Sequence, residues 1–333
     1  MELPSILTSS KSCPLKIQIL AYGTALLVCH HYIYAIPMAV QLGLFVVIML
    51  LTGIPHGAID HLVEEQNQSK NKLRFSLARF LSRYLSKMLL YGILWVFLPT
   101  VALLIFIGIS AYHFGETDLA SLPQEPKSEK NLFLSYGWLL VSVLLVTHLA
   151  EVVPILSSLP RLSDSSLDTA IIWLRQYQTQ YLIACACWFL ASLAYYVLRA
   201  KARLGVLLNV GAQGVVLMVV CAKLPLLLAF SFYFGLWHSL VCLQSIRQHL
   251  MQNGQLLAWN KLVKEAAFFS VIAILGIGAI IVMGNKYNQT PDVLLGLFIG
   301  IAILTAPHME VMSNMFDELR TNAPKQPDGG LAV

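Results

Sequence analysis

The chain has few charged residues. Asp, Glu, Lys and Arg together make up 12% of its 333 residues, about half of the roughly 25% that is usual in soluble domains. Hydrophobic residues make up 57%, and a soluble domain of this size could not cover its surface with so few charges. The composition therefore argues against a cytosolic globular protein, a disordered chain and a nucleic-acid-binding protein.

Several motifs of known enzymes are also absent. The HxxxH and HxxHH boxes of membrane desaturases and hydroxylases do not occur, which sets that chemistry aside. The last two apolar runs, 265–283 and 291–312, lack the lysine that a rhodopsin needs for its chromophore. There is no G-x-S-x-G, no P-loop and no CxxC pair, so the motifs of serine hydrolases, nucleotide-binding enzymes and CxxC metal or redox sites are missing.

Long apolar runs are abundant instead. About 20 consecutive apolar residues are enough to cross a bilayer as a helix, and such runs recur along the chain. They predict an all-α protein, a polytopic transmembrane helical bundle of about eight or nine spans, with residues 1–320 as a single domain. The candidate spans are 16–34, 38–61, 88–117, 132–157, 180–199, 204–221, 225–247, 265–283 and 291–312.

Two segments outside the spans have patterns of their own. In 70–87, Leu and Phe recur at helical spacing among six Lys and Arg residues, which predicts an amphipathic interfacial helix on anionic membrane lipids. The positive-inside rule places this segment in the cytoplasm. We expect a multi-pass protein of the cell inner membrane. We expect the polar, Pro- and Gly-containing tail 321–333 to be disordered.

Four histidines stand well inside long apolar segments, where an ionisable side chain is costly unless it pairs, lines a cavity or binds something. They are His56, His113, His238 and His308. Carboxylates follow three of them closely. Asp60 is four residues after His56, on the same face if the helix persists, and Glu116 is three residues after His113; Glu310 follows the last histidine by two. Because a metal-bound imidazole commonly donates its other N–H to a carboxylate, Asp60 and Glu116 are expected to act as such partners.

These histidines have two interpretations. A single histidine in a membrane helix is more often a hydrogen-bonded packing residue than a ligand. Four separate ones, each beside Gly, Pro or an aromatic residue, favour an intramembrane metal site instead, and imidazoles without a cysteine cluster suit Fe, Zn or Cu rather than Mg or Ca. Aromatic residues beside the histidines either pack in the core or line a tunnel for a long apolar ligand. They are Tyr112, Phe114, Phe234 and Trp237.

Four motifs lie in order between about residues 40 and 315. They are Pro55-His56-Gly57-Ala58 with Asp60, Tyr112-His113-Phe114-Gly115 with Asp118, Phe234-Gly235-Leu236-Trp237-His238-Ser239, and Pro307-His308. At these motifs the chain resembles the bacteriorhodopsin-related-protein-like (Brp/Blh) β-carotene 15,15′-dioxygenases, integral membrane enzymes of bacteria and archaea. The resemblance implies a helical membrane oxygenase with non-haem Fe(2+) held by histidines. It also implies cleavage of a carotenoid from the bilayer, with O₂, at the central double bond to give retinal.

The resemblance is broken at one position. The family's third motif normally carries a second histidine four residues after the first, and here that residue is Cys242. The resemblance therefore implies three metal ligands, His56, His113 and His238. The fourth ligand would be Cys242, His308 or water. We expect His308 to bind, with Cys242 as a nearby wall residue, because a thiolate beside O₂ is prone to oxidation. The departure also leaves an alternative function, a non-catalytic carotenoid- or retinal-binding or metal-handling membrane protein.

Overall fold

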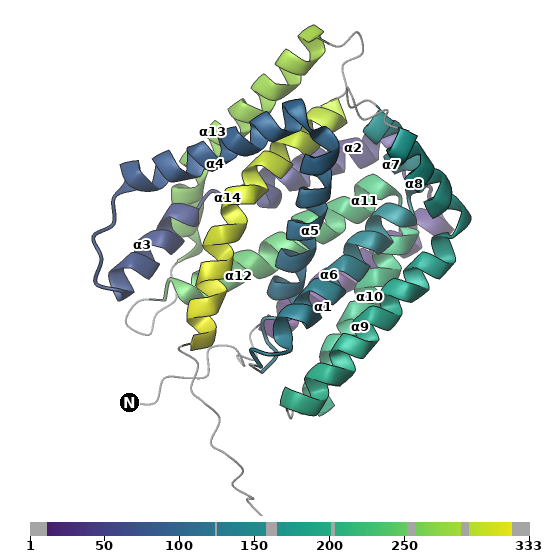
Figure 1. Cartoon of the computed structure of the whole chain (residues 1–333), viewed down its shortest axis with the longest axis horizontal. Helices are drawn as coiled ribbons and strands as arrows, with labels where there is room; N and C mark the ends of the chain where they lie inside the picture. The colour runs from purple at the N-terminus through teal and green to yellow at the C-terminus, as the bar shows by residue number, and fades with distance from the viewer. Residues whose placement is uncertain are drawn as a thin grey trace, which may run out of the picture.

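The computed structural model describes residues 12–123, 125–157, 165–200, 204–251, 258–287 and 293–321. In these ranges every regular element is a helix and no strand occurs (Figure 1), so the all-α prediction is confirmed. The α-helices are α1 (Ser12–Val28), α2 (Met38–Ile48), α3 (Asp60–Lys70), α4 (Leu77–Phe97), α5 (Pro99–Asp118), α6 (Glu129–Val146), α7 (Leu149–Ser157), α8 (Ser165–Gln176), α9 (Gln178–Ala200), α10 (Leu204–Lys223), α11 (Leu226–Phe230), α12 (Ser239–His249), α13 (Trp259–Tyr287) and α14 (Val293–Thr321). Three π-helical segments interrupt them, η2 (Cys29–Ile33), η3 (Met49–Gly53) and η4 (Ser231–His238).

Seven helices in the described part of the chain are long and apolar enough to cross a membrane. They are Pro99–Asp118, Glu129–Val146, Gln178–Ala200, Leu204–Lys223, Leu226–His249, Trp259–Met283 and Val293–Arg320. Large apolar side chains are exposed along several of them, as expected for helices that face lipid. The chain is a multi-pass membrane protein built as a polytopic helical bundle.

Three of the predicted spans are divided. In the predicted span 38–61, the helical part ends at Gly53, and residues 54–59 form turns before α3 begins at Asp60. The predicted span 88–117 breaks at Leu98, whose backbone leaves the helical region, and α5 begins at Pro99. Proline lacks an N–H and disfavours helical geometry in the residue before it, so it starts a helix more readily than it continues one. The predicted span 132–157 likewise divides into α6 and α7 at the turn formed by Thr147 and His148.

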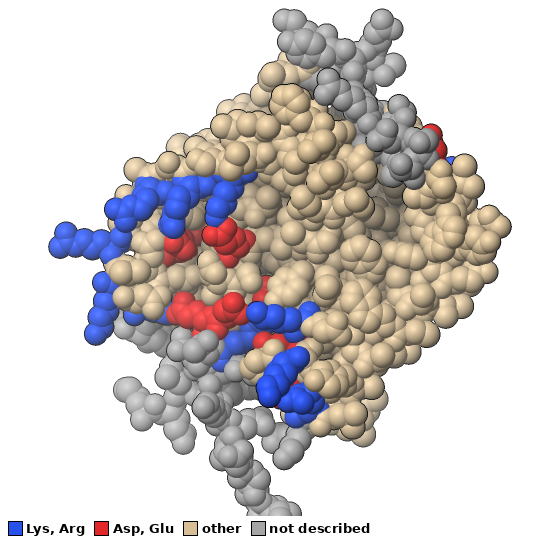
Figure 2. Space-filling view, in the orientation of Figure 1, with Lys and Arg blue, Asp and Glu red and all other residues tan. Residues whose placement is uncertain are grey.

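The helix expected over 70–87 begins only at Leu77. Helix α3 ends at Lys70, and Lys72 adopts a left-handed conformation with φ of 57°. The side chain of Ser76 then caps α4 by accepting a hydrogen bond from the backbone N–H of Arg79. In Figure 2, Lys and Arg side chains gather over α3 and α4, on the left of the view, with acidic residues between them. The right side of the same view is mostly uncharged. Of the tail 321–333, only Thr321 is described, as the last residue of α14.

Helices α5 and α6 cross in close backbone contact because each has a glycine at the crossing. A Cβ atom on Gly115 would overlap the backbone carbonyl of Phe133, and one on Gly137 would overlap the carbonyl of Ala111. Glycine allows this approach because it has no Cβ. The crossing fixes the position of the C-terminal part of α5, where His113 lies.

The segment from α11 through η4 to α12 is the most deeply buried of the candidate spans. Gly235 of η4 lies against Ile48 and Met49, so that η4 packs closely on α2 and η3. Single π-helical turns inside helices occur frequently at functional sites. The two π-helical segments η3 and η4 lead into His56 and His238, respectively.

Candidate metal centre

The structure brings the four intramembrane histidines together into one closed ring. The ring centroid of His56 lies 5.4 Å from that of His238 and 4.9 Å from that of His308. The centroid of His113 lies 4.9 Å from that of His238 and 5.4 Å from that of His308. The four imidazoles come from the turn after η3, from α5, from the end of η4 and from α14, and all four are buried. Segments distant in the sequence therefore converge on one small polar centre.

Most of the ring nitrogens in this centre have no hydrogen-bond partner. Neither ring nitrogen of His113 or His238 has a partner among the described residues, and neither has Nε2 of His308. Buried polar atoms are normally satisfied, because burying one without a partner costs free energy. Several unpartnered imidazole nitrogens that face one another are the arrangement expected of metal ligands. The donor set thus fits a transition metal.

The remaining contacts orient two of the imidazoles. His56 Nδ1 bonds to the carbonyl oxygen of Gly53 and lies 3.2 Å from Ser239 Oγ. His308 Nδ1 lies 2.8 Å from Oδ1 and 3.0 Å from Oδ2 of Asp60. An Nδ1–H that donates to a carbonyl or carboxylate leaves the lone pair of neutral imidazole on Nε2. Both rings are therefore fixed in the tautomer that a metal ligand needs.

Cys242 also lies at this centre, on the same side as His238 as the four-residue spacing predicts. Its sulfur belongs to two groups whose ligand atoms all lie within 4.8 Å of one another, one with His56 and His238 and one with His113 and His308. The side chain is fully buried, and its thiol lies 3.9 Å from the sulfur of Met312. Cys242 is therefore within reach of any metal that the imidazoles bind.

Asp60 does not contact the histidine for which the sequence nominated it. The prediction paired Asp60 with His56 through i, i+4 spacing, but residues 54–59 form turns and α3 begins only at Asp60. The carboxylate instead bonds to His308, from the opposite end of the chain. Glu310 faces outward and pairs with Lys87. Sequence reasoning missed Tyr84, whose hydroxyl donates to Asp60 Oδ2 at 2.9 Å.

Glu116 also differs from its expected role beside His113. Its carboxylate forms an ion pair with Arg320 of α14, and Arg320 lies 3.6 Å from Glu129 of α6 as well. The nitrogens of His113 make no hydrogen bond to Glu116. The three-residue spacing placed the carboxylate one turn along α5, where it faces α6 and α14. Arg320 was not anticipated because its partners are distant in the sequence.

The four aromatic residues divide into two pairs. Phe234 stacks on His238 with centroids 5.8 Å apart, and Phe114 lies 4.8 Å from His238. These two rings form apolar walls against the imidazoles. The other two contact different neighbours: the Trp237 indole N–H donates to Asp118 at 2.9 Å, and the Tyr112 ring lies 6.4 Å from that of Phe133.

His148 shows how a packing histidine differs from those of the centre. Its Nδ1 lies 2.8 Å from the carbonyl oxygen of Leu144, and its Nε2 lies 2.6 Å from that of Leu224. Both ring nitrogens thus have backbone partners next to the break between α6 and α7. The contrast argues against reading the four converging histidines as incidental core residues.

Comparison with known proteins gives two matches. The sequence model of a family described as "Beta-carotene 15,15'-dioxygenase" matches residues 47–316, which include all four histidines. A curated relative, "Beta-carotene 15,15'-dioxygenase" from Uncultured marine bacterium 66A03, is 26% identical over 276 residues, covering 81% of this chain and 92% of that protein. No solved structure matches the chain.

Proposed function

The chain belongs to the β-carotene 15,15′-dioxygenase family, and on this basis we propose that it is a non-haem iron oxygenase that cleaves the central double bond of β-carotene with O₂. The observation that carries the proposal is the closed ring of four buried imidazoles with unpartnered nitrogens. The reaction is inferred from the family, and the ring of histidines is the place where a metal could bind and carry out that reaction.

His56, His113, His238 and His308 would hold Fe(2+), and Cys242 is an alternative donor. Imidazole suits iron, whereas the hard ions Mg²⁺ and Ca²⁺ prefer oxygen ligands. When bound, Fe(2+) supplies the O₂ chemistry that no side chain provides. The reaction consumes one β-carotene and one O₂ and forms two retinal molecules, one oxygen atom entering each aldehyde. This balance requires no net proton donor or acceptor, and we assign no acid or base.

The side chains around the centre orient ligands and exclude water. The Gly53 carbonyl and the Asp60 carboxylate hold the Nδ1 protons of His56 and His308, which leaves the Nε2 lone pairs free and would let them bind the metal. Phe114 and Phe234 present apolar faces beside the imidazoles, and we assign them the nearest contacts with the polyene. Tyr112 and Trp237 contact Phe133 and Asp118 instead, and we assign them no direct contact with the polyene.

The substrate would reach the centre from the bilayer. β-Carotene is an apolar hydrocarbon that partitions into lipid, and the histidine ring lies within a bundle of apolar helices. We propose that the protein lies in the cell inner membrane, with the basic residues around α4 on the cytoplasmic side, as the positive-inside rule predicts. Membrane lipids, the carotenoid and O₂ are the partners that this proposal requires.

Expression in cells that accumulate β-carotene tests the activity. The cells should lose their yellow colour and accumulate retinal, and a chelator should stop retinal formation by the purified protein until Fe(2+) is restored. A His113→Ala variant is the matched negative control. Unchanged β-carotene with no retinal, from protein that is folded and present in the membrane, would contradict the proposal.

One observation favours a second candidate, a metal-handling or non-catalytic carotenoid-binding membrane protein. Cys242 occupies the position where the family normally has a histidine, and a thiol next to four imidazoles suits soft metals such as Cu or Zn. If this candidate is right, the purified protein should carry metal or intact carotenoid while the cells keep their colour.

A further inference from the structure

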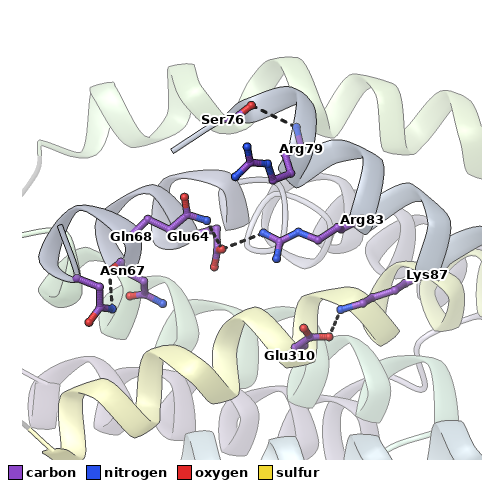
Figure 3. Close-up of polar contacts among 9 residues, drawn as sticks. Glu64, Asn67, Gln68, Ser76, Arg79, Arg83, Lys87 and Glu310 are labelled. Atoms are coloured by element: carbon purple, nitrogen blue, oxygen red, sulfur yellow. Dashed lines mark hydrogen bonds and ion pairs between the residues drawn. The ribbon is translucent and has the colours of Figure 1, made fainter. Parts of the chain in front are cut away.

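Helix α4 contacts the two helices that carry Asp60 and His308, which are α3 and α14. Arg83 pairs with Glu64 of α3, and Lys87 pairs with Glu310 of α14 (Figure 3). Tyr84 lies beside Arg83 in the sequence, and its hydroxyl donates to Asp60 of α3. One helix outside the histidine ring therefore reaches the segments that carry Asp60 and His308.

The three contacts differ in their exposure to solvent or lipid headgroups. The Arg83 side chain is 56% exposed and that of Lys87 is 43% exposed, and such ion pairs contribute little to stability. The hydroxyl of Tyr84 instead meets Asp60, which is 2% exposed. A buried hydrogen bond to a charged group is among the stronger polar contacts in a protein. Tyr84 is therefore the contact of α4 that can influence the centre.

The hydrogen bonds form a continuous chain from α4 to a histidine of the ring. Tyr84 donates to Oδ2 of Asp60 at 2.9 Å, and the same carboxylate accepts from Nδ1 of His308 at 2.8 Å. Nε2 of His308 then faces the ring without a protein partner. The hydroxyl fixes the rotation of the carboxylate and neutralises part of its charge, and the carboxylate fixes the orientation and basicity of the imidazole.

We propose that Tyr84 is a positioning residue that sets the metal affinity of His308 through Asp60. The inference rests on the proposed function, because it requires the histidine ring to bind a metal. Tyr84 is outside the ring of four histidines and reaches it only through Asp60. Loss of its hydroxyl leaves the Asp60 carboxylate with one donor fewer and with freedom to rotate, and the carboxylate then holds the imidazole less firmly in its direction.

The chain offers matched controls on the same helix. Tyr91 is also on α4, is buried, and donates its hydroxyl to the backbone carbonyl of Ala102 at 2.7 Å, away from the centre. Tyr91→Phe removes a comparable hydrogen bond without touching the Asp60 chain. Arg83→Gln removes a surface contact between α4 and α3 and tests whether docking of α4 alone matters.

The quantity to measure is the Kd for Co²⁺, which serves as a spectroscopic probe of the metal site. The full-length protein is placed in lipid nanodiscs, and its Kd is determined by competition with a chelating dye. Outer-sphere partners of ligating histidines typically change metal affinity 10–100-fold, and we expect Tyr84→Phe to raise the Kd about tenfold. Tyr91→Phe and Arg83→Gln should leave it within about twofold of the wild-type value. In an Asp60→Asn background, Tyr84→Phe should have no further effect, because residues that act through one another are not additive.

Each other outcome overturns the proposal. An unchanged Kd in Tyr84→Phe contradicts the proposal directly. An equal rise of the Kd in Tyr91→Phe or Arg83→Gln would mean that the effect comes from the packing of α4 and not from the hydrogen bond to Asp60. Full additivity with Asp60→Asn shows that Tyr84 does not act through that carboxylate. If the wild-type protein binds no Co²⁺ and no Fe(2+), the proposed function fails and this inference with it, whereas failure of the Tyr84 variants alone leaves the metal site intact.

Discussion

At the scale of single residues, hydrogen bonding separates the histidines of the centre from His148. His148 has carbonyl partners for both ring nitrogens, whereas the converging rings keep unpartnered nitrogens that face one another. Sequence position identified the converging histidines because each lies in a long apolar segment with a distinctive flank. It could not identify their carboxylate partners, because the i, i+4 spacing fails where the helix is broken and because, inside a regular helix, spacing does not reveal which other helix supplies a partner. Asp60 follows a run of turns, and Glu116 faces α6 and α14.

The identity of the fourth metal ligand can be tested by substitution. His308→Ala should lower the bound iron at least tenfold, because Asp60 already holds the imidazole in its ligating tautomer. Cys242→Ser should keep most of the iron, because we assign the thiol to the wall of the site. The measurement is iron per purified chain by elemental analysis. Full iron in His308→Ala together with loss of iron in Cys242→Ser would make the thiolate the ligand.

At the scale of elements, glycines and prolines decided how helices pack and where they end. The continuous hydrophobic run predicted one span, but Pro99 begins a new helix, and the structure has two helices there, α4 and α5. The crossing of α5 and α6 at Gly115 and Gly137 was not predicted, because a glycine in an apolar run does not reveal which helix lies against it. The turn between α3 and α4 contains Lys72 in the left-handed backbone conformation, which lysine seldom adopts, so the sequence did not predict it.

The glycine crossing makes a prediction about α5. Gly115→Ala should destabilise the protein by about 1–3 kcal/mol, as overpacking does in other cores, because its Cβ would meet the Phe133 backbone. It should also lower metal content, since α5 must shift and it carries His113. Gly108→Ala on the same helix is the control, because its Cβ would meet nothing within 4 Å. Thermal unfolding in detergent checks both, and equal stability of the two variants would refute the role assigned to the crossing.

The orientation of α4 gives a second prediction at this scale. A cysteine introduced at Arg79, which is exposed near the start of the helix, should react with a membrane-impermeant maleimide only after the inner membrane is permeabilised. The physical reason is that basic residues beside membrane segments remain in the cytoplasm. The unsubstituted chain controls for labelling of native cysteines. Reaction in cells whose outer membrane alone is permeable would place α4 on the opposite side.

At the scale of the whole molecule, composition was sufficient for the fold class. Few charges and recurrent apolar runs predicted a polytopic bundle, and the structure has seven candidate spans in its described residues. The convergence of segments from both ends of the chain on one centre could not follow from spacing, since it depends on how the helices pack. The ordered motifs carried that information only through resemblance to a family, and the family match over residues 47–316 confirms that resemblance.

The most direct test of a histidine-bound iron centre is the iron content of five single alanine variants, compared with wild-type protein purified from iron-supplemented cells. The variants replace His56, His113, His238, His308 and His148. We predict about one iron per wild-type chain and at least a tenfold loss in each of the first four variants. His148→Ala should keep the wild-type iron content, because the ring nitrogens of His148 have backbone partners instead. Wild-type iron content in the variants of the converging histidines, with the proteins folded, would contradict this prediction.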